Sequence, residues 1–148
     1  MPSLSEFRAK GKIIDVRGEI VVFQPSGTTY EIHLNVERDA SAAARPSASK
    51  VPIEGTIRVQ ARKVYTVPSG GNFIAPIFGP PKAIQGRVLS VDDRTIVVQG
   101  ASSAPIIVDL PSADSAIDLS EGTIRVGNLV NVVALPGATF ALLEKATV

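Results

Sequence analysis

Apolar and polar residues alternate along several short segments of this chain, and the clearest of them is YEIHL at residues 30–34. Alternation with a period of two places Tyr30, Ile32 and Leu34 on one face of a β-strand and the polar residues between them on the other. We therefore expect a strand here, with its apolar face in a core and His33 in solvent.

Two apolar segments separated by a turn occupy residues 11–23, and the same pattern returns at residues 86–99. Both copies are rich in Val and Ile, which are typical of strands. The alignment of the second segments sets Ile20 against Ile96, with an extra residue in the later turn. The repetition indicates that the chain contains the same pair of strands twice.

The similarity continues beyond these strands. YEIHL has a counterpart in IIVDL at residues 106–110, and the pentapeptide EGTIR occurs at residues 54–58 and 121–125. Each EGTIR copy is followed by a proline-containing turn and a phenylalanine, Phe73 in the first copy and Phe140 in the second. We expect each turn to close a hairpin, because proline presets φ and glycine accepts positive φ. Two copies of this length indicate a tandem duplication rather than a solenoid, which has shorter and more numerous repeats.

Five strands with an insertion between the third and the fourth follow the order of an OB-fold, a small barrel whose closure removes exposed sheet edges. We predict an all-β protein of two tandem small OB-like five-stranded β-barrels related by internal duplication. The barrels would span residues 1–75 and 84–148, with a proline-rich connector at 76–83. A β-sandwich is the alternative architecture. The insertion at residues 37–52, rich in Ala and Ser, is predicted as either a short helical turn or a loop.

The pattern G-x-[IV]-[IL]-x-V, followed by EIVV or TIVV and later by a hairpin ending in Phe, resembles uncharacterised bacterial proteins with tandem OB-fold-like β-barrel domains. The resemblance covers nearly the whole chain, and its distinctive part is the segment PSGGNFIAPIFGPPKAIQG. It implies the fold, and it implies no known activity because the function of those proteins is unknown.

The connector is predicted to be short and stiff. Its prolines lack the backbone N–H that a strand or helix needs, and they hold the preceding residues extended. Apolar side chains in this segment are predicted to pack either between the two halves or each on its nearer barrel. The candidate residues for a protein interaction are Phe73, Ile74, Ile77, Phe78, Pro80 and Pro81.

Composition limits the possible partners. The formal net charge is +1, so no overall field attracts nucleic acid or an anionic membrane. The chain has no cysteine, which excludes disulfides and thiolate-bound metals. The first residues lack the apolar region of a secretory signal, and no apolar run approaches the roughly 18 residues of a membrane helix. We expect a cytoplasmic protein without a membrane partner.

The sequence offers no convergent catalytic residues, and we predict that the protein is not an enzyme and has no catalytic, metal or cofactor site. His33 is the single histidine, and it is predicted to be an ordinary exposed residue rather than a ligand. Asp92 and Asp93 are adjacent acids in a predicted turn, where neighbouring side chains point apart. We interpret them as turn formers.

Two functions are compatible with this pattern. The first is a non-enzymatic structural or protein-interaction module of two rigidly joined barrels, with a protein partner or self-association in a homo-oligomer or larger assembly. The alternative is a single-stranded nucleic-acid-binding OB-fold protein, because such barrels bind strands through a basic groove with aromatic stacking. Arg58, Gln60 and Arg62 recur at alternate positions of one predicted strand, which places them on one exposed face. The candidate residues for nucleic acid form a short row there: Arg58, Arg62, Lys63 and Tyr65. A solvated sheet face explains the same row without a ligand.

Overall fold

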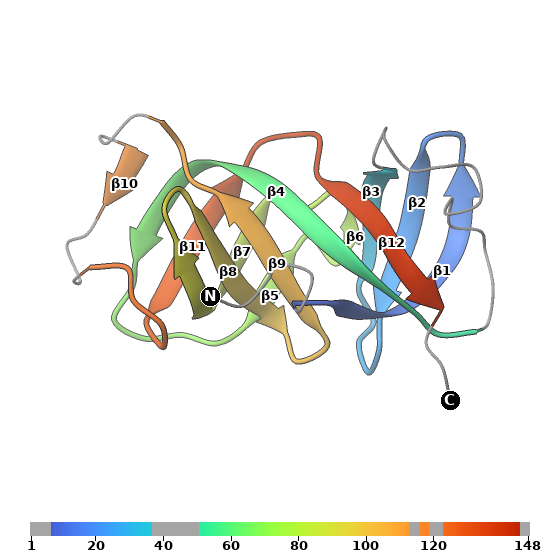
Figure 1. The fold of residues 1–148 in the computed structure, drawn as a ribbon, viewed down its shortest axis with the longest axis horizontal. Helices are drawn as coiled ribbons and strands as arrows, with labels where there is room; N and C mark the ends of the chain where they lie inside the picture. The colour runs from blue at the N-terminus through green and yellow to red at the C-terminus, as the bar shows by residue number, and fades with distance from the viewer. Residues whose placement is uncertain (1–6, 37–50, 113–115, 119–122, 146–148) are drawn as a thin grey trace.

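The computed structural model describes residues 7–36, 51–112, 116–118 and 123–145 (Figure 1). They form a mixed sheet of twelve strands. The strands are β1 (Ala9–Arg17), β2 (Ile20–Pro25), β3 (Glu31–Val36), β4 (Ile53–Thr66), β5 (Phe73–Ala75), β6 (Phe78–Gly79), β7 (Ala83–Asp92), β8 (Thr95–Ala101), β9 (Ala104–Asp109), β10 (Ile117–Asp118), β11 (Leu129–Ala134) and β12 (Thr139–Lys145). The all-β prediction is confirmed. Within the same ranges, no helix is long and apolar enough to cross a membrane.

Strand pairing closes two rings that share β4. The first ring runs β1–β2–β3–β12–β4 and closes where β4 pairs with β1. The second ring runs β4–β11–β7–β8–β9 and closes where β9 pairs with β4. Each ring contains one parallel pairing, β3 with β12 in the first and β9 with β4 in the second. Figure 1 shows β4 crossing the molecule from the side of β1–β3 to the side of β7–β9.

β4 can serve both rings because it is 14 residues long. Its residues up to Arg58 pair with β1 and β12, and its residues from Ala61 onward pair with β11. β12 follows β11 in the chain, yet it pairs with β3 and β4 in the first ring. Strand pairing thus crosses the segment 76–83, and the division of the chain there into two consecutive domains stays a prediction.

The hairpins β1–β2 and β7–β8 are bulged at corresponding places. The extra residue is Ile14 in β1 and Leu89 in β7, as the pairing registers show. Beyond the bulges the two turns are of equal length, and Ile20 closes the first turn as Thr95 closes the second. The later turn therefore holds no extra residue, and the structure places Ile20 opposite Thr95 and not Ile96 in the comparison of the two hairpins.

The buried apolar side chains of both rings form one continuous core. In the first ring, Phe23 and Phe140 pack with their ring centroids 5.1 Å apart. In the second ring, Val64 of β4 is paired with Val132 of β11, and both side chains are fully buried. Because alternate residues of β4 point inward along its length, this strand carries the core from one ring into the other.

Two further expectations differ from the structure. The late hairpins are not formed among the described residues: β5 pairs with β7, while β11 and β12 pair in turn with β4. Residues 54–58 lie in β4, whereas residues 123–125 of the second EGTIR copy lie in no strand. Of the insertion predicted at 37–52, residues 37–50 lie outside the described residues.

Candidate functional site

The connector, taken from here on to include β5 and to span residues 73–83, contains two short strands that attach to different rings. β5 pairs with β7 in the second ring, and β6 pairs with β3 in the first. The Glu31 N–H donates to the Ile77 carbonyl at 2.8 Å, and the Ile74 N–H donates to Tyr30 Oη at 3.3 Å. The connector backbone is therefore hydrogen-bonded to both rings.

The six candidate interaction residues differ in exposure. The buried ones are Ile74 and Pro81, and the exposed ones are Phe73, Ile77, Phe78 and Pro80. A Cβ added at Gly100 of β8 would lie 2.8 Å from Ile74 Cγ1, so Ile74 packs against the second ring while its N–H bonds to Tyr30 of the first. It therefore fits the prediction of packing between the halves. Ile77 and Phe78 do not, because they are 60% and 56% exposed.

We call the four exposed residues Phe73, Ile77, Phe78 and Pro80 the connector patch. The Phe78 ring meets His33 edge to face, with centroids 4.6 Å apart. His33 is half-buried rather than in solvent, and its Nε2 is buried without a hydrogen-bond partner among the described residues. The patch thus begins at the outer face of β3.

An acidic and a basic residue flank the connector patch. Glu31 of β3 stands opposite Phe78 in the register of the parallel pairing, and Lys82 is exposed just beyond Pro80 and Pro81. Neither side chain is hydrogen-bonded or ion-paired within the described residues. Sequence reasoning did not select this pair, because only the pairing of β6 with β3 brings Glu31 to the connector.

The basic row lies on the exposed side of β4. Arg58, Gln60 and Arg62 are exposed at alternate positions, as their spacing predicted. Lys63 is exposed as well, because Arg62 is the extra residue of a β-bulge opposite β11. The bulge reverses the alternation, and Tyr65 is half-buried on the same side. The structure therefore keeps these residues on one strand face.

The first cation of this row is bound to a carboxylate. Arg58 Nε donates to Asp109 Oδ2 at 2.7 Å and Arg58 Nη2 donates to Asp109 Oδ1 at 2.6 Å, a bidentate pairing across β4 and β9. Thr95 Oγ1 lies 3.2 Å from the same carboxylate. Asp109 was missed at the sequence level because its contact with Arg58 depends on the pairing of two strands far apart in the chain.

On the outer face of the first ring, Asp15 forms an ion pair with Arg17, with Arg17 Nε 2.7 Å from Asp15 Oδ2. The hydrogen bond from Arg17 is the main cause that lowers the pKa of Asp15 below its ordinary value of 3.8. Asp15 therefore stays ionised to a lower pH than a free aspartate, which disfavours a role as a proton donor.

The remaining candidate acids lie as expected. Asp92 ends β7, Asp93 follows it in the β7–β8 turn, and the Asp93 N–H donates to Asp92 Oδ1 at 2.9 Å. Among the residues that the structure describes, no three His, Cys, Asp or Glu side chains are grouped closely enough to hold a metal ion. The Asp92 carboxylate thus accepts a local hydrogen bond of the kind that stabilises turns.

Comparison of the chain with protein-family models, with curated proteins and with solved structures found no match.

Proposed function

We propose that this protein is a non-enzymatic structural module that associates with a second copy of itself through the connector patch. In this proposal the two rings are OB-like barrels related by duplication. β4 supplies the fourth strand of the first barrel and the fifth of the second, and β12 supplies the fifth strand of the first. Support comes from the closed five-strand pairing of each ring and from the parallel pairing of the third strand in each.

One observation carries this proposal: the side chains of Ile77 and Phe78 are exposed although their backbone is held in place. That backbone is hydrogen-bonded to the first ring through β6, and it continues directly from β5, which pairs with the second ring. Large apolar side chains held in a fixed position lose little conformational entropy on binding, so they suit an interface. A mobile linker would present the same residues at a greater entropic cost.

A second copy is the partner favoured by charge. Glu31 lies on the first-ring side of the patch, opposite Phe78, and Lys82 lies on the second-ring side, where its N–H donates to the Ala75 carbonyl of β5. A two-fold axis through the patch would bring each of these opposite charges against the other. A stable homodimer buries about 800 Å² of surface on each partner. The four side chains of the patch cannot supply that area alone, so the interface would also include the flanking Glu31 and Lys82.

The test is the mass of the protein in solution, measured by light scattering after size exclusion at several concentrations. We expect a dimer for the natural chain and a monomer for the double variant Ile77→Ser with Phe78→Ser, because removal of central apolar anchors costs 2 kcal/mol or more, a roughly thirtyfold weaker association. Val126→Ser is the matched control, since Val126 is 65% exposed and lies outside the patch. A natural chain that remains monomeric at every concentration would overturn the proposal.

Single-stranded nucleic-acid binding is the weaker proposal. Backbone-tracking grooves use several cations and aromatic faces. In this row the Arg58 charge is compensated by Asp109, and Tyr65 is half-buried, which leaves Arg62 and Lys63 as the charges available to phosphates.

A further inference from the structure

We infer that a cleft on the second ring binds a small organic anion that carries a short apolar chain. The cleft has a volume of about 480 Å³, which lies within the range of small-molecule sites. It is lined by β4 beside the end of β9, by residues 110–112 and by Leu135 of the link between β11 and β12.

The apolar walls are fixed by backbone hydrogen bonds. Leu110, Pro111 and Leu135 line the cleft. The Leu135 N–H donates to the Gln60 carbonyl at 2.7 Å, and the Leu110 N–H donates to the Arg94 carbonyl at 2.8 Å. Because these bonds hold one wall against β4 and the other against the β7–β8 turn, a ligand would enter a site that is already formed.

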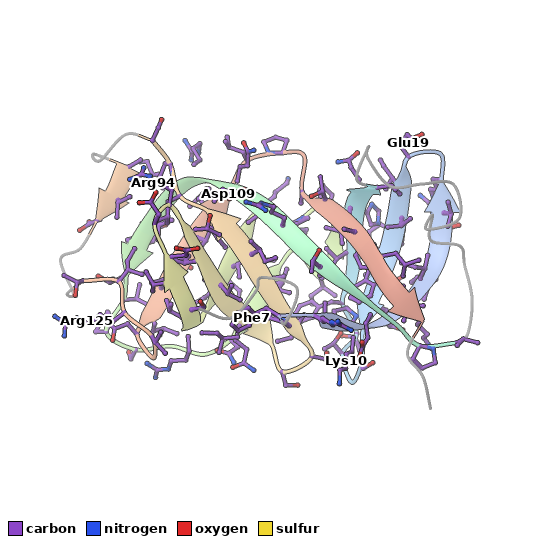
Figure 2. All side chains as sticks on the ribbon, in the orientation of Figure 1. Phe7, Lys10, Glu19, Arg94, Asp109 and Arg125 are labelled. Atoms are coloured by element: carbon purple, nitrogen blue, oxygen red, sulfur yellow. The ribbon has the colours of Figure 1, made fainter. Side chains whose placement is uncertain are left out.

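The charge of the cleft is positive. Arg62 lines it as the bulge residue of β4, and its guanidinium has no hydrogen-bond or ion-pair partner among the described residues. Asp109 also lines the cleft, but Arg58 compensates its charge through both carboxylate oxygens. Arg94 does not line the cleft, but it donates to the carbonyl of Pro111, which does, so a second guanidinium lies next to one wall. Figure 2 shows Arg94 and Asp109 toward the same end of the second ring.

These groups define the chemistry of the ligand. A guanidinium binds a carboxylate in bidentate geometry, so Arg62 would hold the anionic head. The Gln60 amide and the Ser112 hydroxyl also line the cleft and can donate to the remaining lone pairs. The chain of the ligand would lie against Leu110 and Leu135. The cleft offers one arginine beside apolar walls, because the β-bulge exposes Arg62 there. This arrangement fits a small anion better than a nucleic acid, which is bound through several phosphate contacts.

The test is a titration of the ¹⁵N-labelled natural chain with sodium hexanoate, followed by amide chemical shifts. We expect saturable shifts at Gln60, Arg62, Leu110 and Leu135, with weaker binding of acetate, which lacks the chain, and of hexanol, which lacks the charge. Arg62→Gln should weaken hexanoate at least about tenfold, since a hydrogen bond to a charged group contributes about 1.5–3 kcal/mol. Lys63→Gln is the matched control, because Lys63 is the exposed neighbour and does not line the cleft.

Several outcomes would overturn the inference. With the natural chain alone, the inference is overturned if hexanoate causes no saturable shift, or if it binds no better than acetate and hexanol. Equal loss in Arg62→Gln and Lys63→Gln would indicate a general charge effect. An oligothymidylate that shifts the same amides at lower concentration than hexanoate would assign the cleft to nucleic acid. The connector patch shares no residue with the cleft, so failure of either proposal leaves the other standing.

Discussion

Gly11 and Gly86 occupy corresponding places at the start of the two bulged hairpins. A Cβ at Gly11 would overlap the carbonyl oxygen of Gln24, and a Cβ at Gly86 would overlap that of Gln99. Both obstacles are backbone atoms of the paired strand, so they cannot rotate away. Glycine is required at these positions by the close approach of two strands, and neither position has a positive φ.

Gly11→Ala and Gly86→Ala should each lower the free energy of unfolding by about 1–3 kcal/mol, because the added methyl group forces a strand to shift in a packed region. Urea denaturation measures the change as a shift of the unfolding midpoint at an unchanged m value. Gly71→Ala is the control, because a Cβ there meets no atom within 4 Å and its φ is not positive. Equal stability of Gly11→Ala and Gly71→Ala would contradict this account.

At the level of elements, β12 pairs, within the described residues, only with strands that lie far from it in the sequence. It pairs with β3 and with the first part of β4, and its Phe140 is fully buried against Phe23. A Cβ at Gly55 would lie 2.6 Å from Phe140 Cε1, so the ring is also packed closely on β4. β12 therefore seals the first ring.

Phe140→Ala should destabilise the protein by about 3–5 kcal/mol, because it leaves a cavity in a closely packed site. Phe78→Ala removes the same side chain from a position that is 56% exposed, and it should cost about 1 kcal/mol or less. Chemical denaturation followed by circular dichroism compares the two variants. If they lose equal stability, β12 is not seated in the core as described.

Local pattern predicted the strands better than it predicted their partners. The alternation of YEIHL gave β3, and the spacing of Arg58, Gln60 and Arg62 gave the exposed face of β4. The bulge at Arg62 and the pairing of β12 with β3 carry no local signal, because both depend on strands far away in the chain. The identical EGTIR segments misled the alignment of the late strands, since tertiary context overrides local sequence in β structure.

The candidate site was predicted only in part for the same reason. The proline-rich connector and its apolar residues are visible in the sequence, but burial of Ile74 and Pro81 follows from the attachment of β5 and β6 to different rings. The compensation of Arg58 by Asp109 follows from the register of β9 with β4. Each of these facts needs the fold before it can be stated.

At the level of the whole molecule, the two rings share a strand and a core. β4 contributes to both, and removing either end of it would open the ring that pairs with that end. Small single cores usually unfold in one cooperative step. We therefore expect the intact chain to behave as one unit.

A chain divided in the exposed loop at residues 70–71 tests this expectation. Fragment 1–71 lacks β12 and fragment 72–148 lacks β4, so neither should unfold cooperatively alone, because each retains one incomplete ring. An equimolar mixture should regain the circular dichroism spectrum and the single thermal transition of the intact chain. A cooperative transition in either fragment alone would show that one ring is self-sufficient.

The pairing of β12 with strands of the first ring also has a consequence for folding during synthesis. A ribosome makes this strand after every other described strand, so β1, β2, β3 and β4 must wait through the synthesis of the second ring before their interior is sealed. A nascent chain that stalls before residue 139 would keep that interior accessible to chaperones and proteases. The interior of the first ring is therefore covered only after residues 139–145 have been synthesised and have paired with β3 and β4.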